Sequence, residues 1–168
     1  MRRASPLLFL AALTVSVLWA CSVGVVEVQQ AADARDCGLL EAQLGRKEPW
    51  LVEEAASGLG MAGCGEAAGA LTSLMSDGDR DERVRVAAGV ALSRLGRLEA
   101  APLLVEELSR ASHPEARYAL VTALGRLCTR EAVGALEGAV ADGDIYVSRA
   151  ARKGLARCAA AMAGGGAP

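Results

Sequence analysis

Residues 87–96 read AAGVALSRLG, and the same pattern is written twice more in the chain. The other copies are EAASGLGMAG at 54–63 and ALVTALGRLC at 119–128. Leu59, Leu92 and Leu124 coincide in this alignment, at spacings of 33 and 32 positions. The register continues without a gap into a second block, which reads EAAGAL at 66–71, EAAPLL at 99–104 and EAVGAL at 131–136.

A repeat of this length is typical of a solenoid, in which each unit buries its apolar face against its neighbours. Partial copies flank the three whole ones. DCGLLEAQL at 36–44 matches the second half of the unit, and VSRAARKGLAR at 147–157 matches the first half. The sequence therefore predicts a half unit, three whole units and a further half unit.

Each unit is expected to form two helices. Between Val84 and Leu95, apolar residues recur at steps of three and four, which is the helical period. Gly63 and Gly96 follow where a C-terminal cap is expected, and Pro102 falls in the first turn of the next helix. No run alternates polar and apolar residues for long enough to predict a strand, so the expected fold is all-α.

The pattern of paired alanines, then Ala-Leu-Gly, Leu-Gly, Glu-Ala and a leucine-rich helix resembles the short HEAT-like repeats first grouped with phycobilisome lyases. The resemblance covers Asp36 to Ala160. It implies a right-handed α-α superhelix of about three full helical hairpins with a half repeat at each end. Tetratricopeptide repeats have a similar period, but aromatic residues make up only 3% of this chain, and the Thr-Pro-Leu-His of ankyrin repeats does not occur.

The first twenty residues resemble an export signal. Arg2 and Arg3 precede an apolar stretch that ends in LWAC at 18–21, which is similar to the bacterial lipobox. This implies cleavage before Cys21, lipidation of that cysteine and a membrane-anchored lipoprotein facing the periplasm or the outside. Trp19 stands where a small residue is usual and apolar character continues to Val26, so a secreted soluble protein and an uncleaved signal anchor stay open as alternatives.

The same patterns divide the chain. We expect a signal peptide at 1–20, a tether at 21–35, the repeat domain at 36–161 and a disordered tail at 162–168, where GGGAP ends any helix. Removing Arg2 and Arg3 with the signal changes the net charge from −2 to −4. An acidic chain argues against nucleic acid as a partner, because nucleic-acid binding needs a basic face.

Four cysteines follow Cys21, and in an exported protein an even number indicates disulfides. Cys37 falls at the start of the half unit's second helix, and Cys64 lies in a helix–helix turn one unit later. Cys128 occupies a comparable turn, and Cys158 lies one unit beyond it. We predict Cys37–Cys64 and Cys128–Cys158 bonds that join each terminal half unit to its neighbour. Free core thiols are the alternative, and the absence of a CxxC pair disfavours a metal site.

Little in the sequence indicates catalysis. His113 precedes Pro114 in a turn with no adjacent nucleophile or acid pair, so we interpret it as a solvated turn residue. HEAT-like metal hydroxylases need paired His-Glu motifs, which one histidine cannot supply. Phycobilin lyases act on a cytoplasmic pigment, which conflicts with an export signal. We expect no catalytic residue, metal or cofactor. A lyase- or isomerase-like accessory subunit is the alternative, by family analogy alone.

Several arginines recur in the repeat register. Arg94, Arg126 and Arg157 share one position, where they either complement the dipole at the end of each first helix or form a ladder for carboxylates or phosphates. Arg85 and Arg117 share another, and we expect them to pair with acids between units such as Asp77 and Asp79.

The second helix of each unit is expected to line the inner face of the solenoid, where a partner would bind. Its predicted polar positions are mildly acidic and suit a basic or extended protein segment, although a solvated face explains them as well. The residues are Glu41, Thr72, Glu106, Ser109 and Glu137. The expected function is an exported protein–protein interaction or scaffold module of the cell envelope, and a structural subunit of an envelope complex is a further alternative.

Overall fold

The computed structural model describes Gly24 and residues 26–164. This part of the chain is built of helices and the turns that join them. No strand occurs in that part, as predicted. In chain order the helices are α2 (Cys37–Gln43), α3 (Pro49–Ala62), α4 (Ala68–Ser76), α5 (Glu82–Arg94), α6 (Ala101–Arg110), α7 (Pro114–Leu127), α8 (Arg130–Ala139) and α9 (Ile145–Ala163). Short 3-10 turns, η1 (Gly65–Ala67) and η2 (Leu98–Ala100), lead into α4 and α6.

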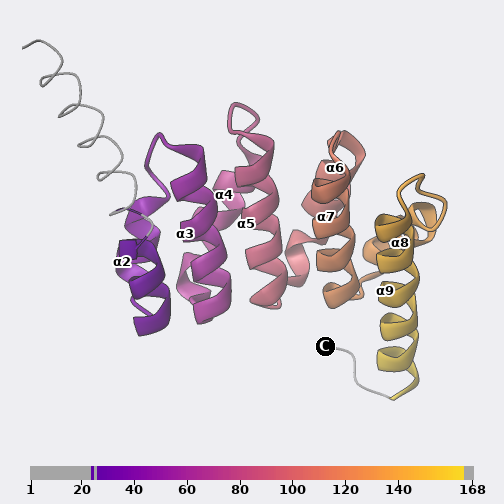
Figure 1. Cartoon of the computed structure of the whole chain (residues 1–168). Coiled ribbons are helices and arrows are strands. Elements are labelled where there is room, and N and C mark those ends of the chain that lie inside the picture. The colour runs from indigo at the N-terminus through magenta and orange to yellow at the C-terminus, as the bar shows by residue number, and fades with distance from the viewer. Residues whose placement is uncertain (1–23, 25, 165–168) are drawn as a thin grey trace, which may run out of the picture.

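The helices alternate between two sets. Helices α3, α5, α7 and α9, here called the first helices, lie in a row in which each packs against the next (Figure 1). Helices α2, α4, α6 and α8, the second helices, pack against α3, α5, α7 and α9 in turn. Each second helix therefore packs against the first helix of the next hairpin.

The helix starts follow from local chemistry. Side-chain oxygens of Asp36, Asp81, Thr129 and Asp144 accept hydrogen bonds from backbone amides in the first turns of α2, α5, α8 and α9. Prolines stand in the first turns of α3, α6 and α7, where a missing N–H removes no helical hydrogen bond. The prediction for Pro102 is confirmed.

Three of the first helices, α3, α5 and α7, are followed by a residue in the left-handed conformation. Gly63 and Gly96 have φ angles of 79° and 69°, which glycine adopts without steric cost. In the third copy Cys128 occupies this position with φ of 53°. A side chain there is disfavoured by about 1 to 2 kcal/mol, and the bond that Cys128 makes to Cys158 accounts for its presence.

The core is built from small aliphatic side chains in the repeat register. Leu59, Leu92 and Leu124 are 0%, 1% and 0% exposed, so the three aligned leucines all lie in the core. The buried leucines, valines and alanines form one cluster that extends from Val28 to Cys158. Because few aromatic residues take part, neighbouring helices approach each other closely.

The first helices approach each other closely at two places, between α7 and α9 and between α3 and α5. A Cβ atom added to Gly125 would lie 2.9 Å from the Cα atom of Gly154, so the two backbones touch. In the same register, a Cβ atom on Gly60 would lie 2.7 Å from the Cα atom of Ala91 at the contact of α3 with α5. Gly60 and Gly125 therefore allow neighbouring first helices to pack at this short distance.

Replacing Gly125 with alanine is expected to destabilise the fold by about 1 to 3 kcal/mol, because backbone rather than a flexible side chain blocks the new methyl group. Gly134 on α8 has no atom within 4 Å of an added Cβ, so Gly134→Ala is the matched control. That control should stabilise by about 0.5 to 1 kcal/mol through helix propensity. Urea unfolding of both variants measures the difference, and equal effects would contradict the close approach.

Two predicted boundaries are wrong. Residues 26–34 are helical and not a polar tether, and Val28 and Ala31 are 1% and 5% exposed. The reason is that their apolar side chains cover the end of the core beside α3, where Ala32 lies close to Gly58. At the other end α9 continues to Ala163, so helix occupies the start of the predicted tail. The predicted signal peptide, Cys21 and residues 165–168 lie outside the described part.

Candidate functional site

The five residues predicted to bind a partner all lie on the second helices. Thr72 is half-buried, and its hydroxyl donates a hydrogen bond to the Ala68 carbonyl over 2.8 Å. Glu106 pairs with Arg110 at the surface. Glu41, Ser109 and Glu137 are exposed. The grooves described below are lined by other residues, so the second-helix site stays a prediction.

The grooves lie along the first helices, and we call this side the first-helix face. A wide groove of about 830 Å³ lies along α5 and α7. It carries charges of both signs, such as Glu53 and Arg94, and its floor contains Val86, Ala87 and Val90. A second groove of about 380 Å³ lies between α7 and α9.

At the wide groove His113 is an exposed residue of the turn between α6 and α7, as predicted, but its ring contacts two polar side chains. Its Nδ1 atom lies 2.6 Å from the Glu82 carboxylate and 3.0 Å from the Ser112 hydroxyl. Glu82 also accepts a hydrogen bond from the Ser112 amide over 3.0 Å. Ser112 and His113 follow Glu82 by 30 and 31 positions, which is about one repeat unit. Because the three residues are so far apart in the sequence, their contact was not predicted.

This cluster does not have the geometry of a nucleophile–base pair. In such a relay the hydroxyl and the carboxylate meet opposite ring nitrogens, whereas here both meet Nδ1. The His113 side chain is also 70% exposed. Burial raises the pKa of Glu82, but hydrogen bonds from His113 and the Ser112 amide outweigh it and hold that pKa below its ordinary value. The cluster ties the α6–α7 loop to α5.

Arg85 does not pair with Asp77 or Asp79 as predicted. Its guanidinium instead contacts the Glu107 carboxylate at 2.9 to 3.1 Å and donates to the Arg80 carbonyl. The side chains of Arg85 and Glu107 are 14% and 3% exposed. Hydrogen bonds to Glu107 raise the pKa of Arg85 against the opposing effect of burial. The prediction was wrong because the Arg85 side chain extends toward α6, the second helix of its own hairpin, and not toward the loop before α5.

Arg117 does pair with an acid between units. Its guanidinium contacts Asp142, in the loop between α8 and α9, at 2.9 and 3.2 Å. It also donates to the Ser112 carbonyl, five residues back, as Arg85 does to Arg80. Arg85 thus ties α5 to α6 of the same hairpin, and Arg117 ties α7 to the loop that follows α8.

The Asp142 pair predicts a loss of stability in acid. The Arg117 guanidinium and the Asp144 amide hold the pKa of Asp142 below its ordinary value of 3.8. Its contribution is therefore complete above that value and is lost as the pH falls through the lower folded pKa. Asp142→Asn should reduce the drop in unfolding free energy between pH 5 and pH 2, measured by urea titration. An unchanged drop would contradict this assignment.

The three repeated arginines do not occupy equivalent places in their helices. Arg94 and Arg126 lie in the last turns of α5 and α7, as the helix-dipole reading expects. Arg157 does not, because α9 continues to Ala163. Burial lowers the pKa of Arg126, and the nearby charges of Arg94 and Arg157 lower it further. The three arginines therefore form a ladder in which Arg126 lies near the like charges of the other two.

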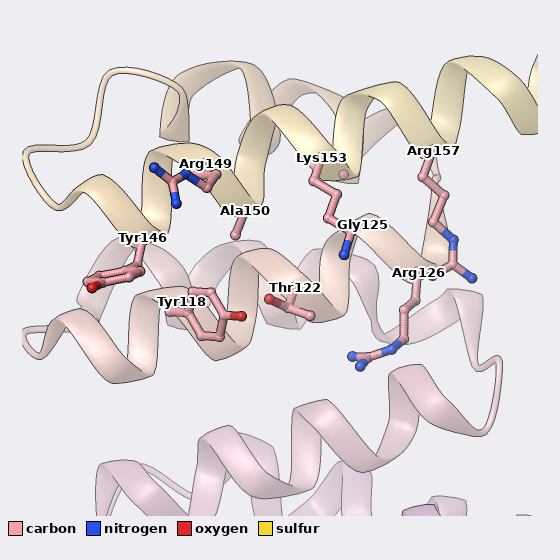
Figure 2. A pocket seen from close by; sticks show the side chains of 10 residues that line it. Tyr118, Thr122, Gly125, Arg126, Tyr146, Arg149, Ala150, Lys153 and Arg157 are labelled. Carbon is pink, nitrogen blue, oxygen red and sulfur yellow. The ribbon is translucent and has the colours of Figure 1, made fainter.

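The groove between α7 and α9 contains two members of this ladder. Tyr118, Thr122 and Arg126 come from α7, and Tyr146, Arg149, Lys153 and Arg157 come from α9 (Figure 2). Sequence reasoning missed the tyrosines, Arg149 and Lys153, because the repeat register does not mark them. The signal was present nevertheless, since steps of three and four place the four α9 residues on one helix face.

The cysteines pair as the repeat register predicts. Cys37 is bonded to Cys64 with a Cα–Cα distance of 5.6 Å, and Cys128 is bonded to Cys158 with a distance of 5.1 Å. Cys37, Cys64 and Glu66 place three potential metal donors together, the one such group among the described residues. Since the two sulfurs are bonded to each other, only the Glu66 carboxylate is left as a donor there.

No helix in the described part of the chain has both the length and the apolar character needed to cross a membrane. No protein-family model matches the sequence, and a comparison with curated proteins finds no match. The candidate site is the first-helix face, because the two grooves lie on it.

Proposed function

We propose that the chain is an exported, HEAT-like protein-interaction module of the cell envelope, tied to the membrane through a lipid on Cys21. The repeated hairpins support the array, since each first helix packs against the next and the aligned leucines are equally buried. The two disulfides support export, because such bonds persist in oxidising compartments. In this proposal the hairpins form a right-handed superhelix.

The observation that carries the interaction role is the grooved first-helix face. Two open grooves lie on it, between helices that succeed one another along the row. An elongated face of this kind suits an extended segment of another protein better than a small substrate. Among the described residues, the Ser112–His113–Glu82 cluster comes nearest to catalytic chemistry, and its geometry does not support an acid–base relay.

Chemical crosslinking of intact cells, followed by purification of the full chain, tests the interaction role. We expect a discrete crosslinked species that contains one particular second protein. Recovery of the chain alone, at crosslinker doses that capture a known envelope complex in the same cells, would count against the proposal.

Metabolic labelling with a radioactive fatty acid tests the anchor separately. The wild-type chain should carry label and sediment with membranes, whereas Cys21→Ala should lose both properties. Cys21 is distinct from the four bonded cysteines, so the variant leaves the fold intact. Unchanged membrane attachment of Cys21→Ala would overturn the lipid anchor and would favour an uncleaved signal anchor.

A further inference from the structure

The groove between α7 and α9, here called the basic groove, differs in charge from the rest of the molecule. Its lining contains Arg126, Arg149, Lys153 and Arg157 and no acidic residue. The whole chain has a net charge of −2, and the neighbouring wide groove contains four carboxylates. The overall composition therefore does not account for the four basic side chains in this groove.

These cations are not used to hold the fold together. Among the described residues none of the four lies within ion-pair distance of a carboxylate, whereas Arg85, Arg110 and Arg117 all have acidic partners. Burial, together with the nearby charges of Arg94 and Arg157, lowers the pKa of Arg126. Unpaired like charges in a groove oppose folding, so a bound anion is the simplest reason for placing them there.

The floor of the basic groove is uncharged, and two tyrosines stand at one end of it. Gly125 and Gly154 line it where α7 and α9 touch, so no side chain of either residue fills the space. Tyr118 and Tyr146, 47% and 66% exposed, stand at one end (Figure 2). They also line an adjoining hollow of about 310 Å³ with Pro114, Glu115 and Asp144. An apolar side chain suits the tyrosine end, and carboxylates suit the rest.

The spacing of the cations matches an extended peptide. Arg149, Lys153 and Arg157 lie four residues apart on α9, which separates them by about 6 Å along the helix axis. Side chains on one side of an extended chain recur every two residues, at about 6.6 Å. A single carboxylate or phosphate group would meet only one or two of these cations, whereas an extended segment with acids at alternate positions meets all three.

We propose that the basic groove binds an acidic, extended segment of the partner protein, with carboxylates at alternate positions and an apolar residue against Tyr118 and Tyr146. This inference rests on the proposed interaction function and gives the chemistry of the partner. Arg126 completes the site from the α7 side. A nucleic-acid strand would use the same combination of cations and aromatic rings. Carboxylates line the neighbouring wide groove and the adjoining hollow, which favours a short acidic segment over a long polyanion.

The test measures fluorescence anisotropy of a labelled peptide, Leu-Ala-Glu-Ala-Glu-Ala-Glu-Ala-Leu, titrated with the full oxidised chain in detergent at low salt. A peptide with glutamine for glutamate is the first control. We expect the glutamate peptide to bind about tenfold more tightly or better, since three ion pairs form together, and we expect salt to weaken it. Equal binding of the two peptides would overturn the proposal.

The double variant Arg149→Glu/Lys153→Glu should weaken binding of the glutamate peptide by about tenfold or more. The charge-matched control is Arg130→Glu/Arg152→Glu, at exposed positions outside the groove. It should have much less effect, and circular dichroism should show both variants folded. Equal weakening by the two pairs would mean that net charge alone drives binding, and would also overturn the proposal.

Two further results separate the alternatives. Tighter binding of a nine-nucleotide oligothymidylate than of the glutamate peptide would assign the groove to nucleic acid and reject an acidic segment. If the peptide fails to bind while crosslinking in cells still captures a partner, the acidic-segment inference falls and the interaction function stands.

Discussion

Replacing Glu107 with alanine is expected to lower the free energy of unfolding by about 3 to 5 kcal/mol, because it leaves the Arg85 guanidinium poorly solvated and unpaired. The Glu107 side chain is 3% exposed and accepts three hydrogen bonds from Arg85. The other contact of Arg85, to the Arg80 carbonyl, cannot neutralise its charge. Urea unfolding followed by circular dichroism measures the loss.

The adjacent residue provides the control. Glu106 also pairs with an arginine, Arg110, but both side chains are about half exposed. Glu106→Ala should therefore cost about 0.5 kcal/mol or less. The double variant Arg85→Met/Glu107→Leu should recover much of the loss, because it removes both charges from the interior. Equal effects of Glu106→Ala and Glu107→Ala would contradict the buried ion pair.

Removing the Cys128–Cys158 bond is expected to cost about 3 to 4 kcal/mol in the chain-entropy model. The bond joins residues 30 positions apart and holds α9 to the end of α7. Cys128→Ser/Cys158→Ser removes it but keeps a side chain at a left-handed position. Cys128→Gly/Cys158→Ser should be less destabilised by about 1 kcal/mol, since glycine adopts that conformation freely.

The Cys37–Cys64 bond has a comparable separation of 27 residues and is expected to contribute a similar amount. Thermal unfolding with and without reductant should show both contributions, and each double variant should lose only part of the effect of the reductant. Mass spectrometry of non-reduced peptides identifies the pairs directly. Four alkylatable thiols, or a link between the two ends of the array, would contradict the pairing.

The repeat accounts for most of what the sequence could predict. Once Leu59, Leu92 and Leu124 were aligned, the alignment placed the hairpins, the turn glycines and both cysteine pairs, since equivalent positions meet equivalent neighbours. Residues 26–34 were missed because they have no copy to align with. Their polar residues suggested a tether, although Val28, Ala31 and Ala32 follow steps of three and one that suit one helix face.

The candidate site was less predictable. The arginine ladder followed from the register. The basic groove also needs Arg149, Lys153, Tyr118 on α7 and Tyr146 on α9, and these residues have no copies in the other repeat units. The groove also depends on the contact between Gly125 on α7 and Gly154 on α9. That contact follows from how the two helices pack and cannot be read from the sequence of either one. The partner of Arg85 was wrong for a related reason, because a long side chain can reach either an adjacent loop or the next helix, and only the backbone path decides.

Site-specific photo-crosslinking in cells tests the central claim that the first-helix face binds a protein partner. The photoreactive residue is placed at Ala116 and Thr122, which line the two grooves, and at Gly134 and Gly138, which are exposed on α8. We predict the same partner adduct from both groove positions and none from α8. Adducts from α8 with none from Ala116 or Thr122 would contradict the account.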